Sequence, residues 1–178
     1  GTILIDGIDI AQIDPADLRK GISYVPQDIH LFGGTIKQNI LGIHKFIDDE
    51  WMLECSKISG TDEFVRMHPA GYDMPLGERG AGLSGGQRQS VGISRALINN
   101  SDIWMFDEPT NAMDQTSESI VLNNLMSKIE GKTLLLVTQK MSMVDLVDRI
   151  IVMNFGTKVL DGPKDEIINK LGNSGEKQ

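Results

Sequence analysis

The stretch DIWMFDEPT, from Asp102 to Thr110, constrains the fold more than any other part of the chain. Its residues 103–106 are all apolar, so a strand here would bury both faces, which is typical of a parallel sheet covered by helices on both sides. Asp107 and Glu108 then lie at the carboxyl end of the strand, the edge at which open α/β sheets bind ligands. One carboxylate could hold a metal ion while the other orients a water molecule. Alternatively, Asp107 caps the following turn and Glu108 is merely solvated.

The pattern from residue 84 onward alternates between helix and strand, which indicates an α/β fold with mainly parallel strands. Ser84 is a good N-cap for a helix that we expect to end near Asn99. We expect strands over 102–107, 133–138 and 149–154, and helices over 116–129 and 141–147. The last segment, GTKVLDGPKDEII, predicts a final strand, a Gly-Pro turn and a closing helix.

The amino-terminal part of the chain begins within a strand pattern, GTILIDGIDI, which we expect to turn at its Asp-Gly pair. Asp14-Pro15 predicts the start of a short helix, because Asp is a good N-cap and Pro suits the first helical position. GISYVPQD predicts a strand stopped by its proline, and a helical subdomain is predicted by the segments 35–41, 48–59 and 61–68. Since no loop or cap precedes the first strand, we expect further sequence upstream of Gly1.

Composition excludes several classes of protein. At 178 residues, of which 40% are hydrophobic, the chain is long enough for one packed domain. A net charge of −8 argues against a general nucleic-acid surface. The single cysteine, Cys55, cannot form an internal disulfide and lies in an apolar helical pattern, which fits a packed residue in a reducing compartment. No apolar stretch approaches the roughly 18 residues of a membrane helix, so work at a membrane would need another segment or chain.

Two glycine motifs are misleading. Residues 80–85 satisfy the three-glycine dinucleotide fingerprint, but the preceding MPLGER is charged and turn-rich, whereas this fingerprint must follow a buried strand. Residues 131–133, Gly-Lys-Thr, imitate the end of a phosphate-binding loop, but their threonine starts a strand and a phosphate loop opens a helix. We therefore reject the dinucleotide site and interpret the second motif as a helix stop.

Five ordered motifs, which together span most of the chain, resemble those of the ATP-binding cassette (ABC) family. LSGGQ resembles the signature motif of that family, and IWMFD resembles its Walker B strand. The matching residues are Gln27 for the Q-loop, Leu83, Ser84, Gly85, Gly86 and Gln87 for the signature, Asp107 for Walker B, Glu108 for the catalytic glutamate, and residues 111–114, ending in Asp114, for the D-loop. The resemblance implies an ABC ATPase core of the P-loop NTPase type with an inserted helical subdomain.

The chemistry of these positions suits ATP hydrolysis. Ser84 offers a hydroxyl at a helix start, and the glycines after it allow close backbone approach, so this helix N-terminus attracts an anion. In the resembled family that anion is the γ-phosphate of ATP held by the opposite subunit, which implies a head-to-tail homodimer. The resemblance further implies that Asp107 holds Mg²⁺ through water and that Gln27 contacts the metal and the water. Glu108 would orient or deprotonate that water.

Two departures from the family pattern affect the expected activity. The family's phosphate loop with its lysine, and its adenine-stacking aromatic, would both lie before Gly1, so we expect an amino-terminally truncated domain that hydrolyses ATP negligibly by itself. The family usually has a histidine where this chain has Gln139. A glutamine amide can donate one hydrogen bond to a γ-phosphate but cannot exchange a proton near neutral pH, so the full domain could be slower or degenerate.

The segments around the Q-loop and before the signature resemble exporters, most closely the ATPases of bacterial type I secretion systems that move toxins or adhesins. Residues 78–80, Glu-Arg-Gly, resemble the exporter X-loop, which contacts transmembrane domains; otherwise they form a charged turn. Phe32 and Ile36 would line the groove that receives a coupling helix, or else belong to the core of the helical subdomain.

The resemblance therefore implies an ATP-driven exporter, with this domain at the cytoplasmic face of the bacterial inner membrane. The implied partners are a second ATP-binding domain, the transmembrane domain of the exporter and a transported protein or peptide, with no nucleic acid. We assign residues 28–82 to the Q-loop and helical subdomain, and 83–170 to the signature helix, Walker B, D-loop and switch region. Alternatives are an exporter of peptides, lipids or drugs, a soluble non-transport ABC ATPase, and a catalytically degenerate regulatory domain.

Overall fold

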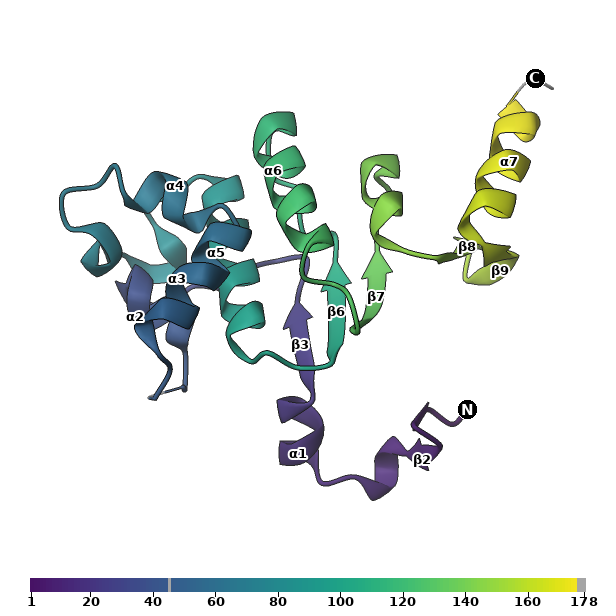
Figure 1. Ribbon diagram of the computed structural model, residues 1–178, viewed down its shortest axis with the longest axis horizontal. Helices are drawn as coiled ribbons and strands as arrows, with labels where there is room; N and C mark the ends of the chain where they lie inside the picture. Colours follow the sequence, from purple (N-terminus) through teal and green to yellow (C-terminus); the bar gives the residue numbers. More distant parts are fainter. Residues whose placement is uncertain (45, 176–178) are drawn as a thin grey trace. The chain divides into compact units, whose positions relative to one another are not determined.

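The computed structural model describes residues 1–44 and 46–175, with the side chains of 173–175 excepted. The chain divides into two compact units, Gly1–Val137 and Thr138–Gln178, and each has its own architecture. Figure 1 shows the elements of both units along the chain. None of the helices in the described part of the chain is both long and apolar enough to span a bilayer.

A three-stranded parallel sheet lies at the centre of the first unit, in the order β3, β6, β7 (Figure 1). Its strands are β3 (Ile22–Val25), β6 (Ile103–Asp107) and β7 (Thr133–Val137), and β6 and β7 are each one residue shorter than predicted. Helix α6 (Gln115–Met126) connects β6 to β7, the kind of crossover that parallel neighbours require. The expected α/β class is therefore confirmed.

One face of this sheet forms the core. Trp104 and Phe106 are buried on it, and their rings stack with centroids 5.6 Å apart. Val25 lies opposite Phe106 in the register and is fully buried. The Ser23 hydroxyl donates to the Ala96 carbonyl of helix α5 (Gly85–Ile98) over 2.7 Å. This hydrogen bond and the packing of β3 on α5 fix the helix to the sheet.

The opposite face of the sheet differs from the prediction. Tyr24, Met105 and Leu135 lie in one register row across the three strands. Tyr24 and Leu135 are 56% and 53% exposed. The uniformly apolar run of β6 predicts cover on both faces, but in the described residues this row stays partly open to solvent. The prediction of two covered faces is therefore wrong for this part of the chain.

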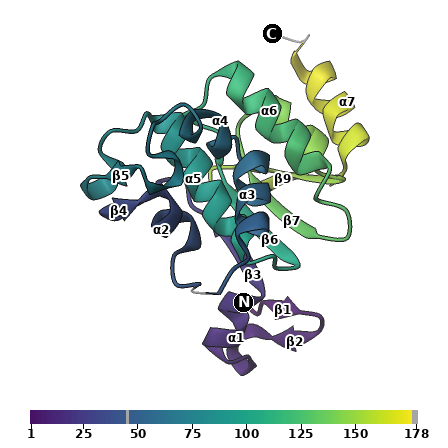
Figure 2. The ribbon, with the colours of Figure 1, turned by 60° about the vertical axis from the view of Figure 1, so that its left-hand side comes forward.

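Three helices, which we call the helical subdomain, pack around α5 (Figure 2). They are α2 (Ile36–Leu41), α3 (Asp49–Ile58) and α4 (Thr61–Val65). A two-stranded antiparallel sheet of β4 (Gly34–Thr35) and β5 (Pro75–Leu76), which are distant in the sequence, adjoins α2. The helix predicted over 61–68 ends early, and the 3-10 turns η2 (Gly71–Asp73) and η3 (Glu78–Gly80) follow it. Cys55 is fully buried in α3 as expected, and this burial raises the pKa of its thiol to about 12.

Buried hydroxyl groups join the subdomain to α5. The hydroxyl oxygens of Ser59 and Ser94 lie 2.6 Å apart, and the Thr61 hydroxyl is 2.9 Å from each of them. All three side chains are fully buried, so each hydroxyl needs a partner inside the protein. The cluster supplies these partners and fixes the turn between α3 and α4 against α5.

The amino-terminal elements agree with the prediction. Strands β1 (Leu4–Ile5) and β2 (Ile8–Asp9) form an antiparallel hairpin, whose turn is the Asp6-Gly7 pair with φ values of 49° and 80°. A 3-10 turn, η1 (Ile10–Gln12), leads to helix α1 (Pro15–Lys20). Asp14 caps α1 by accepting a hydrogen bond from the Ala16 amide over 2.7 Å.

The second unit consists of an antiparallel hairpin flanked by helical segments. Its elements in order are η4 (Met141–Leu146), β8 (Arg149–Asn154), β9 (Thr157–Pro163) and α7 (Lys164–Gly175). The strand predicted over 149–154 is confirmed, whereas the segment predicted as a helix over 141–147 is a 3-10 helix. The predicted Gly-Pro turn is wrong, because Gly162 pairs with Ile150 within β9. Pro163 ends that strand, where its missing N–H is tolerated.

Candidate functional site

Glu108 lies just beyond β6, with a φ of 45° that residues with side chains rarely adopt. Its N–H donates to the Val137 carbonyl over 2.9 Å, and its carbonyl accepts from the Asn111 amide over 3.2 Å. The chain therefore turns sharply after Asp107. Asp107 is half-buried and Glu108 is 9% exposed, so the two adjacent carboxylates occupy different environments. The alternative in which Glu108 is merely solvated is contradicted by this burial.

Ser84 begins α5 through a capping box. Its hydroxyl oxygen accepts from the Gln87 amide over 3.1 Å, and the side-chain oxygen of Gln87 accepts from the Ser84 amide over 2.9 Å. The predicted helix start is therefore confirmed. The aligned peptides of this 14-residue helix place partial positive charge at its N-terminus, so Ser84 lies where an anion is stabilised.

Gly85 and Gly86 pack against the D-loop, residues 111–114, of the same chain. A Cβ on Gly85 would lie 3.0 Å from the Cβ of Ala112, and one on Gly86 would lie 3.1 Å from the Ala112 carbonyl oxygen. Both contacts are tighter than ordinary van der Waals packing, so a side chain at either position would push the D-loop away. The sequence explains these glycines by the approach of an anion, and the structure adds this second reason within the chain.

Asp114 caps α6 and ends the D-loop. Its carboxylate accepts from the Thr116 and Ser117 amides over 3.0 Å each, and from the Ser117 hydroxyl over 2.7 Å. These hydrogen bonds, those from Ser117 above all, lower the pKa of Asp114. At the start of the loop, the buried Thr110 hydroxyl donates to the Glu118 carboxylate of α6 over 3.0 Å. Both ends of the D-loop are thus anchored to α6.

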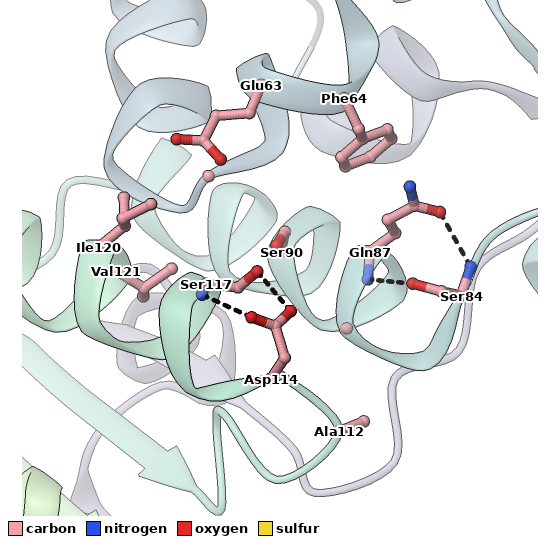
Figure 3. A pocket seen from close by; sticks show the side chains of 12 residues that line it. Glu63, Phe64, Ser84, Gln87, Ser90, Ala112, Asp114, Ser117, Ile120 and Val121 are labelled. Atoms are coloured by element: carbon pink, nitrogen blue, oxygen red, sulfur yellow. Dashed lines mark hydrogen bonds between the residues drawn. The ribbon is translucent and has the colours of Figure 1, made fainter.

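A cavity of about 220 Å³ lies between the start of α5, the D-loop and α4. Figure 3 shows its lining, in which side chains of α4 face the first turns of α5 and α6. The lining residues are Gly60, Glu63, Phe64, Ser84, Gly86, Gln87, Ser90, Ala112, Asp114, Ser117, Ile120 and Val121. The structure therefore brings three predicted signature residues into one cavity with Asp114.

A second cavity, of about 390 Å³, contains the predicted Q-loop residue. It is lined by Gln27, Asp28, Ile29, His30, Arg79, Gly85, Arg88, Gln89 and Ala112. Gln27 therefore shares a cavity with Gly85 of the signature and with Ala112 of the D-loop. The Q-loop, the X-loop-like turn and the signature helix meet here, although Gln27 precedes both Arg79 and Gly85 by more than fifty positions in the sequence.

Asp107 and Gln27 offer oxygen ligands of the kind that Mg²⁺ prefers. Strands β3 and β6 are parallel, with Val25 opposite Phe106, so both residues leave the same edge of the sheet. Within the described residues, no group of three His, Cys, Asp or Glu side chains is placed to hold a metal ion. A donor set of one carboxylate and one amide fits Mg²⁺ bound jointly with nucleotide phosphates, the usual arrangement for this ion.

Phe32 and Ile36, the two residues predicted at the groove for a coupling helix, differ in exposure. Ile36 is fully buried at the start of α2 and belongs to the subdomain core, whereas Phe32 is 46% exposed. The Arg95 guanidinium lies 5.6 Å from the centroid of the Phe32 ring. It also donates to the Asn39 carbonyl over 2.7 Å and to the His30 carbonyl over 2.9 Å. Arg95 thereby holds the segment after the Q-loop against α5, with Phe32 at the surface.

The remaining predicted residues lie in three different settings. Glu78 and Arg79 expose their side chains in η3, and Arg79 has a φ of 57°. Leu83 is buried, and its carbonyl accepts from the Arg88 guanidinium over 2.7 Å. Gln139 is exposed in the second unit, two residues after the end of β7. Leu83 is therefore a packing residue, and Gln139 belongs to a different unit from the other site residues.

Several residues that shape the site were not among the predicted ones. Gln89 is 5% exposed on α5 and bonds to the segment that follows β6. Its signal in the sequence is a polar side chain on the buried face of a helix, since such a group needs a partner. Glu63 and Phe64 of α4 line the first cavity. No local pattern marks them, because their position depends on tertiary packing.

The sequence and the fold of this chain are similar to those of known proteins. A family model described as ABC transporter matches residues 1–111. The leukotoxin translocation ATP-binding proteins LktB of Mannheimia haemolytica and Mannheimia glucosida are each 41% identical over 168 residues, which cover 94% of this chain and 24% of theirs. The solved structure of a bacterial Atm1-family ABC exporter with ATP bound has a TM-score of 0.90 at 33% identity, and covers 96% of this chain and 30% of that one. The chain thus spans about a quarter of the length of the curated relatives it matches.

Proposed function

The chain belongs to the ABC transporter family, and on that premise we propose that it forms part of the ATP-hydrolysing unit of a bacterial exporter. We assign this exporter to the type I secretion class, which moves protein toxins or adhesins, on the 41% identity to leukotoxin translocation proteins. One observation carries the ATPase proposal. The helix start at Ser84 and the turn at Glu108 both adjoin the D-loop, so an anion site and a water-orienting carboxylate belong to one packed segment.

In this proposal ATP is the substrate, and the residues divide the work. Glu108 orients or deprotonates the water that attacks the γ-phosphorus. The Ser84 hydroxyl and the α5 N-terminus stabilise the γ-phosphate charge of a nucleotide held by a second copy. Asp107 and Gln27 would hold Mg²⁺, which neutralises phosphate charge when it is bound. The other residues of this nucleotide-facing surface are Leu83, Gly85, Gly86, Gln87 and Asp114.

The proposed partners follow from the same family membership. A second copy would pack head to tail, and the transmembrane domain of the exporter would contact the helical subdomain at the cytoplasmic face of the inner membrane. Within the chain, residues 28–82 would receive this contact, and residues 83–170 would carry the signature, Walker B, D-loop and switch functions. The exposed Phe32 and Arg79 support a docking surface on the first of these segments.

An exporter with a different cargo is the second candidate. The Atm1-family exporter is 33% identical over 96% of this chain, and this similarity favours a shared ATPase unit with another kind of transported molecule. The two candidates share every residue role given above. They differ in the cargo that stimulates hydrolysis.

The experiment uses the complete polypeptide that contains this chain, reconstituted in lipid vesicles. We expect phosphate release at millimolar MgATP, stimulated by a type I secreted polypeptide. The isolated chain should release negligible phosphate, because residues 1–178 contain no phosphate-binding loop with its lysine. A complete protein that does not hydrolyse ATP would contradict the enzymatic proposal. Stimulation by a lipid or drug rather than by a polypeptide would select the second candidate.

Two different replacements of Gln139 should change ATP turnover in opposite directions. If its amide donates one hydrogen bond to the γ-phosphate, Gln139→Ala in the complete protein should cost about 1–3 kcal/mol of transition-state stabilisation. Gln139→His should raise turnover, because histidine can also exchange a proton near neutral pH. The measurement is kcat together with ATP affinity, with Gln12→Ala on the exposed turn η1 as a control. Equal turnover of the Gln, His and Ala proteins would exclude contact of residue 139 with the reacting phosphate.

A further inference from the structure

We propose that Gln89 is a positioning residue that holds the catalytic turn against the signature helix of the same chain, an inference that rests on the function proposed above for Glu108. Gln89 lies in the second turn of α5 and is 5% exposed. Its side-chain oxygen accepts from the Ala112 amide over 2.7 Å, and its side-chain nitrogen donates to the Glu108 carbonyl over 3.3 Å. One side chain thus holds both ends of the segment 108–112, which runs from the proposed catalytic residue into the D-loop.

The chemistry of an amide suits this position. The Ala112 N–H can only donate and the Glu108 carbonyl can only accept, so the bridging side chain must supply one acceptor and one donor. A glutamate would supply acceptors alone when ionised, and a lysine would supply donors alone. Methionine has a similar length but forms neither strong hydrogen bond. Glutamine is therefore specified by the two backbone groups that it joins.

The backbone at Glu108 needs such support. A φ of 45° is unfavourable for a residue with a side chain, and surrounding contacts must keep it there. Backbone hydrogen bonds to Val137 and from Asn111 provide part of this support. Gln89 adds a contact from a different element, because it belongs to the helix that starts with the signature. Loss of this contact would loosen the backbone from which the Glu108 carboxylate projects.

The same contact links the proposed phosphate site to the catalytic carboxylate. Ala112, which Gln89 binds, also packs on Gly85 at the start of α5. A displacement of this helix start, such as one produced by phosphate binding at Ser84, would act on Ala112 directly and on Glu108 through Gln89. The connection from Ser84 to Glu108 therefore consists of a few contacts, through Ala112 and Gln89, and each of them can be removed by mutagenesis.

The test compares two substitutions in the complete transporter. Gln89→Met keeps the length of the side chain but loses both hydrogen bonds, and should lower kcat about tenfold with KM for ATP changed less than about twofold. It should also speed amide hydrogen exchange across residues 108–114. Gln89→Glu keeps the acceptor for Ala112 and loses the donor to Glu108, so it should lower kcat while the Ala112 amide stays protected.

A matched control separates positioning from general stability. Ser94→Ala removes a buried hydroxyl contact from the same helix, away from the catalytic turn, and should lower the unfolding midpoint with kcat unchanged. Equal losses of kcat in the Ser94 and Gln89 variants would show a purely structural role and overturn the proposal.

The Glu108→Gln background gives a second decisive readout. There, Gln89→Met should have little further effect on residual hydrolysis, because the carboxylate that it positions is already gone. A further tenfold loss would contradict the positioning role. If the wild-type transporter proves unable to hydrolyse ATP, the proposed function fails, and hydrogen exchange decides the contact by itself. Unchanged exchange over 108–114 in Gln89→Met would then overturn the inference.

Discussion

The Glu108→Gln variant of the complete transporter should hydrolyse ATP about 10²–10⁴-fold more slowly than the wild type, while still forming a nucleotide-dependent dimer. The amide matches the carboxylate in size, so the sharp turn after β6 is kept. It cannot accept a proton from the attacking water, however, and catalysis should fail at that step. The proposed contacts to phosphate should be unaffected, because they come from other residues. Phosphate release and size-exclusion chromatography in MgATP measure the two effects separately.

Asp102→Asn is the matched control for this substitution. Asp102 precedes the same strand at its opposite end, and its carboxylate is 3.3 Å from the Lys132 ammonium with a side chain that is 94% exposed. Surface ion pairs contribute little, so turnover should change by less than about twofold. A monomeric Glu108→Gln protein in MgATP, or one with unimpaired hydrolysis, would contradict the proposed role of this carboxylate.

Features that depend on neighbouring residues could be predicted from the sequence. Asp14 and Ser84 start helices at the expected positions, because a cap bonds to backbone groups only two or three residues away. The apolar run before Asp107 forms a strand for a similarly local reason. Parallel pairing on both of its edges followed from the alternation of helices and strands around it.

Features that depend on neighbours distant in the sequence were predicted less well. The segment 149–154 is a strand as expected, yet it pairs with β9 in an antiparallel hairpin, and periodicity does not identify a partner. The apolar run of β6 indicates burial of both faces, but exposure depends on which elements cover the sheet. The segment 141–147 has helical composition, and its shortness and tertiary surroundings give a 3-10 helix.

The same distinction between local and long-range features applies to the candidate site. Motif order predicted which residues would lie near the carboxyl edge of the sheet, and their roles in catalysis stay predictions. From the sequence, Gly85 and Gly86 are explained by the close approach of a phosphate. The structure shows that both also contact Ala112 of the same chain. The Gln89 bridge spans 19 and 23 positions to its two partners, so no local pattern could specify it. Such long-range contacts determine how the motif residues are held.

The capping boxes of α2 and α5 allow stability and function to be separated. Thr35 and Ser84 each begin a helix with a glutamine three residues later, and both boxes are complete. Loss of either cap should cost a comparable amount of stability, about 1 kcal/mol. Thr35→Ala therefore serves as the control for Ser84 substitutions, since it removes an equivalent cap from a helix outside the proposed phosphate site.

Ser84→Arg in the complete transporter should lower ATP hydrolysis by about 10²–10³-fold, comparable to the loss of one preorganised donor at a developing charge. Its bulk would also occupy the space in front of the α5 N-terminus, where the phosphate is proposed to bind. Because we propose that this phosphate belongs to the nucleotide of the partner, the affinity of each subunit for its own ATP should be unchanged. Titration with ATP and phosphate release measure these quantities, beside Thr35→Ala. A parallel loss of ATP affinity would mean that Ser84 serves the nucleotide of its own subunit, and the head-to-tail arrangement would then be wrong.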